Sequence, residues 1–545
     1  MGYMTMKELI KYSADKYKDG VAYQMRAESG EYRKITFRQV EELARKVQGA
    51  LLKLGVAKGD RVALISENRP EWTISYLAIA GMGATNVPLD AMQNKEEIRP
   101  LIEDSTPKAI VLSKKFEEYP KGTVVDKKEL FMEDIANLPT PDSLPDFEVS
   151  SDDLAAIVYT SGTTGIPKGV MLSHSNIMSN VQSAVTKFVF GPEDNWLTAL
   201  PLHHTFETTA GFLAPFYTGG TKTFPETLKS HAILQNLQET GVTILGSVPL
   251  FYKLLYEGVW RQVEEQGKKK IFSVLFALSK FFKHVLGLNI GKILFKPLHK
   301  KFGGKIRFFI TGGAAFNAEL VKNYDLMGFT VLQGYGLTES SPILAMETLQ
   351  EKKPGSVGKP VPGVEIKIAG SDPIGEVLAF GPNIMKGYYK RKQQTSEMIV
   401  NGWLHTGDLG YIDEEGYLFL TGRSKDIIVT GAGVNVYPDE LEAMLDKIPV
   451  IKESCILAEK IKEGVKKGTE QVIAVIVPDM EYFEKAGNKD EGFIKETITK
   501  EVDAFNAKVA PYKRLARFVL RKEELPRTRL MKIKRFKLRK ELNLE

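Results

Sequence analysis

The stretch from Tyr159 to His174, YTSGTTGIPKGVMLSH, follows a strand-like run and combines hydroxyl side chains, glycines and one lysine. Small residues let backbone N–H groups approach an anion closely, and hydroxyls and a lysine add donors and positive charge. These residue types could hold phosphate. The common nucleotide loop, Gly-x-x-x-x-Gly-Lys-Ser/Thr, does not match, because Lys168 follows Pro167 and precedes Gly169. A surface turn rich in Gly, Ser and Thr is the alternative interpretation.

Further motifs downstream narrow this choice. Five stretches follow the loop in order: TGGAAF (311–316), GYGLTES (334–340), HTGDLG (405–410), GRSKDIIVTGAGVNVYPDELE (422–442) and LPRTRLMKIKR (525–535). With the loop, they resemble the adenylate-forming (AMP-binding) enzymes across essentially the whole chain. Within that superfamily the details are most similar to the medium/long-chain fatty acyl-CoA synthetases.

The resemblance implies a reaction in two halves with ATP, Mg²⁺ and CoA. The carboxylate of a fatty acid attacks the α-phosphorus of ATP, pyrophosphate leaves, and the thiol of CoA then displaces AMP from the acyl-adenylate. Neither half needs a protein nucleophile, so the protein must supply positive charge and fixed donors. An acyl-adenylate ligase that delivers to a carrier-protein thiol is the alternative, and a non-enzymatic AMP or lipid sensor is disfavoured by the complete set of motifs.

By resemblance, the loop holds the phosphates and the next motifs hold the nucleoside. The β- and γ-phosphates would lie against Thr160, Ser161, Gly162, Thr163, Thr164, Gly165 and Lys168. Magnesium is expected on Glu339, with the Ser161 hydroxyl nearby, since Mg²⁺ prefers few carboxylates together with phosphate oxygens and water. The adenine pocket would be formed by Gly312, Gly313, Ala314, Tyr335 and Gly336.

The remaining nucleotide contacts implied by the resemblance fall on separate motifs. Thr338 would contact the α-phosphate and is a catalytic candidate with Glu339 and Lys532. Asp408 would accept the ribose hydroxyls, and Arg423 would contact ribose or phosphate.

Two lysines carry family roles in the last part of the chain. Lys425 falls at the family's hinge, and Lys532 falls where the family places the lysine that bridges the acid and the α-phosphate. The usual Ser/Thr-Gly-Lys is Leu-Met-Lys here, so the loop lacks its glycine. Long-chain synthetases have a similar glycine-free version, and Lys534 is the competing candidate.

The acyl and CoA ends of the site have their own candidates. His204, in LPLHHTFE, would lie at the acyl-pocket entrance, where packing or gating is favoured over a catalytic base because the chemistry requires none. Gly433 and Tyr437 would border the channel for the pantetheine arm of CoA.

These residues need an α/β framework to position them. Short apolar runs such as RVALIS, KAIVLS, LAAIVY, VTILGS and IRFFITGG recur with helical stretches between several of them, which predicts parallel strands with crossover connections. After Pro360, closely spaced strand pairs predict a β-rich subdomain. We therefore expect a large N-terminal layered α/β domain, 1–421, and a small mobile α+β C-terminal domain, 422–545.

Composition limits the classes of protein. One cysteine, Cys455, excludes an internal disulfide, and the seven histidines show no Cys/His pairing at zinc-ligand spacing. The charged first residues are unlike a secretory signal, so a cytoplasmic location is expected. Residues 72–89 are uncharged but contain Gly, Asn and Pro, which favours a helix end followed by a buried strand over a membrane span.

Two regions are strongly basic. Residues 261–305 contain eleven Lys and Arg against two Glu, interleaved with Phe and Leu, and residues 513–540 contain thirteen against two. The second is expected to serve the phosphates of ATP and CoA. The first predicts either peripheral contact with an anionic membrane, at its inner face, or a helical insertion with solvated lysines. No nucleic-acid-binding module is recognised, so nucleic acid is not an expected partner, and the sequence carries no signal for an oligomeric state.

Overall fold

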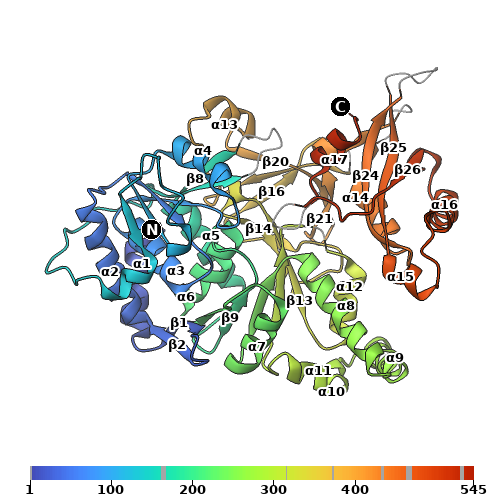
Figure 1. The fold of residues 1–545 in the computed structure, drawn as a ribbon, viewed down its shortest axis with the longest axis horizontal. Helices are drawn as coiled ribbons and strands as arrows, with labels where there is room; N and C mark the ends of the chain where they lie inside the picture. Colours follow the sequence, from blue (N-terminus) through green and yellow to red (C-terminus); the bar gives the residue numbers. More distant parts are fainter. Residues whose placement is uncertain are drawn as a thin grey trace. The chain divides into compact units, whose positions relative to one another are not determined.

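The computed structural model describes residues 3–160, 167–188, 190–314, 316–370, 373–430, 435–461, 469–527 and 533–544. They form two compact units (Figure 1), Met1–Ile366 with Ala379–Leu404 and Lys367–Leu378 with His405–Glu545. The second unit thus includes residues that precede the predicted boundary at 422. The boundary at 422 was predicted as the point where a mobile C-terminal domain begins, and it stays a prediction.

The larger sheet of the first unit has nine strands in the order β15-β14-β13-β12-β11-β9-β10-β1-β2. The strands from β13 to β1 in this order run parallel, and the edge pairs are antiparallel. Their bounds are β1 (Val21–Arg26), β2 (Tyr32–Thr36), β9 (Asn195–Thr198), β10 (Thr221–Phe224), β11 (Ile244–Ser247), β12 (Phe308–Gly312), β13 (Val331–Gly336), β14 (Ile343–Met346) and β15 (Lys359–Pro360).

The second sheet of this unit has seven strands in the order β18-β8-β7-β4-β3-β5-β6. Here β8 pairs antiparallel with both β7 and β18, and the other pairs are parallel. The bounds are β3 (Arg61–Ile65), β4 (Thr85–Pro88), β5 (Ala109–Leu112), β6 (Glu129–Phe131), β7 (Leu154–Thr160), β8 (Lys168–Ser173) and β18 (Gly387–Tyr388). The predicted parallel strands are confirmed.

Helix α3 (Pro70–Gly81) lies between these two sheets. It contacts β1 of the nine-stranded sheet and β3, β4 and β7 of the seven-stranded sheet, and all its residues are buried. A helix that is apolar on every side requires such a position. The prediction of a helix end and a buried strand within 72–89 is therefore confirmed.

The other helices of the first unit begin at sequence-encoded caps in several cases. Thr5, Thr36, Asn94 and Ser173 each form a capping box, which satisfies backbone N–H groups of the first helical turn. The helices are α1 (Met6–Tyr17), α2 (Phe37–Lys53), α4 (Lys95–Ser105), α5 (His174–Lys187), α6 (Ala214–Thr218), α7 (Ser230–Thr240), α8 (Pro249–Glu265), α9 (Lys269–Leu286), α10 (Gly291–Leu294), α11 (Lys296–Lys301), α12 (Ala318–Leu326) and α13 (Lys392–Met398). Short 3₁₀ or π turns are η1 (Lys114–Phe116), η2 (Met132–Asn137), η3 (Glu207–Leu213) and η4 (Thr338–Ser340).

A small sheet follows residue 360, as the closely spaced strand pairs predict. Its order is β16-β17-β20-β19, with β21 beside β20. The bounds are β16 (Glu365–Ile368), β17 (Gly375–Phe380), β19 (Ile399–Val400), β20 (Trp403–Ile412) and β21 (Leu418–Arg423).

After β21, the second unit forms an α+β fold around its own core. A three-stranded sheet, β24-β25-β26, packs with α14 and α16 around buried Ile, Val, Leu and Phe. Cys455 lies buried in β24. The elements are η5 (Ser424–Asp426), β22 (Ile428–Val429), β23 (Asn435–Val436), α14 (Pro438–Leu445), β24 (Ile451–Lys460), β25 (Glu470–Pro478), α15 (Met480–Lys485), α16 (Glu491–Lys508), η6 (Pro511–Lys513), β26 (Arg517–Leu520) and α17 (Arg535–Glu541).

Across the described ranges, no helix is both long enough and apolar enough to cross a membrane.

Candidate active site

The predicted phosphate loop connects two paired strands. Thr160 at the end of β7 lies directly opposite Lys168 at the start of β8 in an antiparallel ladder. The two ends of the loop are therefore held side by side. Ser161, Gly162, Thr163, Thr164 and Gly165 lie outside the described residues.

Tyr388 joins the lysine of this loop to the predicted magnesium carboxylate. Its hydroxyl donates a hydrogen bond to Glu339 Oε1 at 2.8 Å, and Lys168 Nζ lies 5.1 Å from the centre of its ring. Burial and the Glu339 charge raise the pKa of Tyr388 above its ordinary value, so the phenol stays neutral. The structure thus brings two predicted site residues, Lys168 and Glu339, to the same tyrosine.

The backbone explains why Tyr388 reaches this place. In β18, Tyr388 pairs with Val170 of β8, and the Met385 amide donates to the Glu339 carbonyl at 2.9 Å. Tyr388 was not among the residues predicted from the sequence. The only local feature of the sequence at this position is the pair of tyrosines in KGYYKR. That feature does not indicate that Tyr388 pairs with a strand more than 200 residues earlier in the chain.

The predicted adenine residues lie at the ends of adjacent parallel strands. Gly312 ends β12 opposite Gly334 of β13, and Tyr335 and Gly336 follow on β13. A Cβ at Gly336 would come within 1.7 Å of the Pro342 carbonyl oxygen, so this position requires glycine. Gly313 and Ala314 come directly after β12, and Thr338 begins η4 beside Glu339. Ligands of open α/β sheets bind at such carboxyl ends.

Two buried hydroxyls at the same edge were not predicted. Ser247 ends β11 and Thr311 lies in β12, each about 1% exposed. Neither hydroxyl oxygen has a hydrogen-bond partner among the described residues. Buried polar atoms are normally satisfied, so these two hydroxyls depart from the usual pattern at the edge where the predicted adenine residues lie.

His204 lies in a segment that follows β9. Asn68 anchors this segment through the Leu200 carbonyl and the Leu202 amide, at 2.6 and 2.9 Å. The rings of His203 and His204 are 4.1 Å apart. Burial and the neighbouring His204 lower the pKa of His203 well below its ordinary value, so His203 remains neutral at physiological pH. The structure leaves the predicted packing or gating role of His204 as a prediction.

A buried ion pair lies next to this segment. Lys222 of β10 bonds Glu207 of η3, and both contact the hydroxyl of Thr198 at the end of β9. Burial lowers the pKa of Lys222. Because breaking a buried pair leaves an uncompensated charge, the pair ties η3 firmly to the sheet.

The ribose candidates lie together in the second unit. Asp408 of β20 is opposite Arg423 of β21, and Arg423 Nε lies 2.9 Å from Asp408 Oδ1. Glu376 supports the HTGDLG motif, since it accepts from the Gly407 amide at 3.0 Å and bonds His405 Nδ1 at 2.9 Å. The motif residue Gly407 has a φ of 70°, which favours glycine.

The predicted hinge and CoA-channel residues follow β21. Lys425 is exposed in η5, and Tyr437 is half-buried at the N-cap of α14. Gly433 lies outside the described residues.

Residues 528–532, which include the catalytic candidate Lys532, lie outside the described residues. The basic C-terminal motif is held in place on both sides of this gap. Arg527 and Ile533 are paired by an antiparallel bridge, and the Lys534 amide donates to the Pro526 carbonyl at 2.7 Å. Arg535 then binds Asp439 at 2.6 Å and also pairs with Glu442 of α14.

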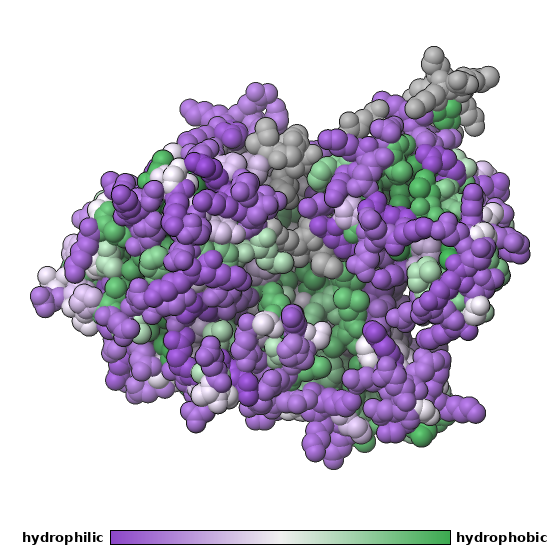
Figure 2. Space-filling model, in the orientation of Figure 1, coloured by the Kyte–Doolittle hydropathy of each residue, from purple (hydrophilic) through white to green (hydrophobic). Residues whose placement is uncertain are grey.

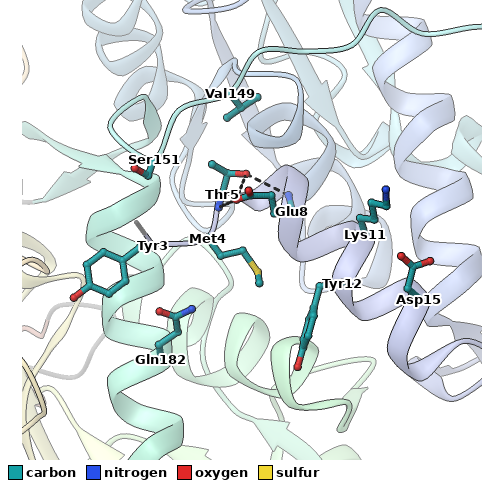
Figure 3. Close-up of a pocket in the computed structure, with 10 residues that line it drawn as sticks. All are labelled: Tyr3, Met4, Thr5, Glu8, Lys11, Tyr12, Asp15, Val149, Ser151 and Gln182. Carbon is teal, nitrogen blue, oxygen red and sulfur yellow. Dashed lines mark hydrogen bonds between the residues drawn. The ribbon is translucent and has the colours of Figure 1, made fainter. Parts of the chain in front are cut away.

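A pocket of about 680 Å³ lies elsewhere in the first unit, beside the start of α1. Figure 3 shows Thr5 and Glu8 near the centre of the pocket lining, joined by hydrogen bonds from the Thr5 amide and hydroxyl to the Glu8 carboxylate. Gln182 of α5 lies on another side of the pocket. Its lining is Tyr3, Met4, Thr5, Glu8, Lys11, Tyr12, Asp15, Val149, Ser151 and Gln182, which includes none of the predicted site residues.

The donor set of the first unit fits magnesium bound with a nucleotide. Glu339 provides one carboxylate, and no group of three or more His, Cys, Asp or Glu that could hold a metal occurs in the described part of the chain. Magnesium commonly takes one or two carboxylates and completes its shell with phosphate oxygens and water. Glu339 suits that arrangement, and Lys168 nearby suits the phosphates.

Comparisons with known proteins agree with this geometry. Residues 10–389 match the AMP-binding enzyme family. The chain is 31% identical over 475 residues to long-chain-fatty-acid–CoA ligase FadD15 of Mycobacterium bovis, covering 81% of this chain and 78% of that protein. It is also 31% identical over 441 residues to 2-succinylbenzoate–CoA ligase of Bacillus velezensis, covering 78% and 80%.

A solved structure matches the whole fold. The ATP-bound crystal structure of MatB from Rhodopseudomonas palustris superposes with a TM-score of 0.79 and 27% identity, covering 99% of both chains. The predicted fold class, a large N-terminal α/β region with a smaller C-terminal one, is confirmed.

Proposed function

Because this chain belongs to the AMP-binding enzyme family and is an adenylate-forming acyl-CoA ligase, we propose that it activates a fatty acid with ATP and transfers the acyl group to CoA. The observation that carries the adenylation half is the junction at Tyr388, where a lysine and a carboxylate meet at the base of the loop. A triphosphate with its magnesium ion needs both signs of charge at one place.

In the first half-reaction the acid's carboxylate oxygen attacks the α-phosphorus, and the bond to the β-phosphate oxygen breaks. Lys168 and the loop would hold the departing pyrophosphate, Glu339 would hold magnesium, and Thr338 would contact the α-phosphate. When bound, magnesium neutralises charge that develops on the phosphate oxygens. Lys532 bridges the two reacting anions, so the step depends on positioning and charge.

In the second half-reaction the sulfur of CoA attacks the acyl carbon, the bond to the AMP oxygen breaks, AMP leaves through its phosphate oxygen, and the thiol proton passes to solvent. Gly433 and Tyr437 border the path of the pantetheine arm. The hinge at Lys425 lets the small C-terminal domain, 422–545, change its position between the two halves.

The fatty-acid substrate is supported by the relative named for long-chain fatty acids, whereas a relative of the same percentage identity named for 2-succinylbenzoate supports an aromatic acid. A panel of acids separates them. Pyrophosphate release should depend on ATP, magnesium and a fatty acid, and should be strongest for fatty acids when CoA is present. Preference for aromatic acids would contradict the substrate, stimulation by a carrier protein but not CoA would contradict the acceptor, and release of ADP would contradict the reaction.

The hinge has a separate test. Proline fixes φ near −65°, so Lys425→Pro should hold one arrangement of the two domains. Acyl-adenylate formation should survive and thioester formation should fail, measured as separate half-reactions, with Lys425→Ala as the control. Equal loss of both halves in Lys425→Pro would contradict a hinge at this residue.

A further inference from the structure

Helix α9 exposes a continuous row of large apolar side chains. Ile271, Val274, Leu278, Phe281 and Val285, here called the apolar stripe, are each between 41% and 62% exposed. They are three or four residues apart, so they share one face of the helix. Leu286 at the last position of the helix, and Leu288 and Ile293 beyond it, are also exposed.

The opposite face of α9 holds it on the body of the first unit. Phe272 and the partly buried Leu275 and Phe276 belong to a core cluster with residues of α8 and β12. The Ser279 hydroxyl donates to the Leu326 carbonyl at 2.6 Å, and Lys283 pairs with Asp325. The helix is therefore fixed by one face, and the apolar stripe is left outside the core.

The charged residues of the chain segment that carries the stripe have one sign, and the carboxylates of Glu264 and Asp325 that reach α9 pair with Lys269 and Lys283. Between positions 266 and 318 the chain has no Asp or Glu and eleven Lys and Arg. Lys270 and Lys280 are exposed on α9, and Lys292 and Lys296 are exposed just beyond it. Figure 2 shows a mainly hydrophilic face on which hydrophobic residues reach the surface along the lower edge, the region where Figure 1 labels α9, α10 and α11.

We propose that the apolar stripe and its flanking lysines seat the protein on the surface of an anionic lipid bilayer. Apolar side chains that enter the headgroup boundary and lysines that contact anionic lipids are the two contributions such binding requires. A second copy of the chain would bring two surfaces of the same positive charge together, which disfavours it as the occupant. The proposal goes beyond the proposed function and does not depend on the identity of the acid.

Vesicle co-sedimentation without ATP, acid or CoA tests this. The stripe variant is Ile271→Gln, Phe281→Gln and Val285→Gln, since glutamine is a good helix former at exposed positions. Its matched control replaces three exposed apolar residues elsewhere in the first unit, Val124→Gln, Leu228→Gln and Leu349→Gln. Circular dichroism and Tm check that each variant is folded.

A second variant tests the charge. Lys270→Gln, Lys280→Gln, Lys292→Gln and Lys296→Gln remove flanking lysines, and Lys283 is kept because it pairs with Asp325. Wild type and the matched control should bind vesicles of phosphatidylcholine with phosphatidylserine, and bind pure phosphatidylcholine more weakly. The stripe and lysine variants should each lose about tenfold or more in partition coefficient on the anionic vesicles.

Three results would overturn the proposal. One is no vesicle binding by wild type, and another is equal binding by wild type and both variants. The third is a wild-type dimer in sedimentation velocity that the stripe variant loses while neither protein binds vesicles, which would assign the stripe to a second copy of the chain.

Discussion

Two carboxylates predicted for the nucleotide site, Glu339 in the first unit and Asp408 in the second, have partners of different charge. Glu339 accepts a hydrogen bond from the neutral phenol of Tyr388, at 2.8 Å. Asp408 lies 2.9 Å from the guanidinium of Arg423. The phenol orients the Glu339 carboxylate without adding charge. The Arg423 guanidinium, in contrast, compensates the negative charge of Asp408.

The difference suits two kinds of ligand. A carboxylate that keeps its negative charge attracts a divalent cation, and a charge-compensated carboxylate still has oxygens that can accept from neutral hydroxyls. The partners therefore support the assignment of Glu339 to magnesium and Asp408 to ribose. Substitutions that remove charge from each unit test whether the two carboxylates serve these different ligands.

The largest effect is expected in the second unit, from Lys532→Ala. This substitution tests whether the second unit also supplies positive charge to the reacting groups. Loss of a charged contact to the transition state costs about 3 kcal/mol or more, roughly a hundredfold in rate. Acyl-adenylate formation should fail, while supplied acyl-adenylate should still react with CoA. Damage from Lys534→Ala with a silent Lys532→Ala would move the role to Lys534.

In the first unit, Glu339→Gln removes the charge and keeps the size of the side chain. We expect a loss of about a hundredfold in kcat/KM for ATP, partly recovered at high magnesium, because the amide is a weak magnesium ligand. Titration of the rate with magnesium measures this. An unchanged magnesium dependence would separate Glu339 from the metal.

The matching change in the second unit is Asp408→Asn. It replaces one of the two acceptor oxygens with an NH2 group and removes the charge, and a hydrogen bond to a charged group contributes about 1.5–3 kcal/mol, so KM for ATP should rise roughly tenfold or more. The magnesium dependence should stay as in wild type. If Asp408→Asn shifted it and Glu339→Gln did not, the two assignments would be reversed.

The smallest effect is expected from Tyr388→Phe, which removes the hydrogen bond to Glu339 and keeps the ring beside Lys168. A hydrogen bond to a charged group contributes about 1.5–3 kcal/mol, but the phenol acts on the nucleotide only through Glu339, so we expect only part of this in catalysis, a loss of severalfold in kcat/KM. Tyr388→Ala serves as the contrast, because it also removes the ring. Wild-type activity of Tyr388→Phe together with damage from Tyr388→Ala would assign Tyr388 a packing role only.

Local patterns predicted much of this molecule because the features concerned are local. Apolar runs separated by helical stretches predicted the parallel strands, and the stretch LGYIDEEGYLFL forms the antiparallel pair β20 and β21 through its central turn. The neighbouring positions of Asp408 and Arg423 follow from that hairpin. The phosphate loop likewise connects strands that are adjacent in sequence.

Contacts between distant segments were beyond such patterns. Tyr388 meets Glu339 because β18 pairs with β8, and Lys222 meets Glu207 inside the fold. Helices α3 and α9 are both rich in apolar residues, yet α3 is buried between two sheets and α9 is covered on one face only. Which faces are covered depends on elements far along the chain.

The burial of Cys455 has a practical consequence for enzymology. It is the chain's single cysteine, and burial raises the pKa of its thiol to about 12. The thiolate is the reactive form, so the folded protein should react only very slowly with a thiol-specific chromophore. Consumption of the CoA thiol can then be followed directly with such a reagent, against a protein background that is nearly silent until the chain unfolds.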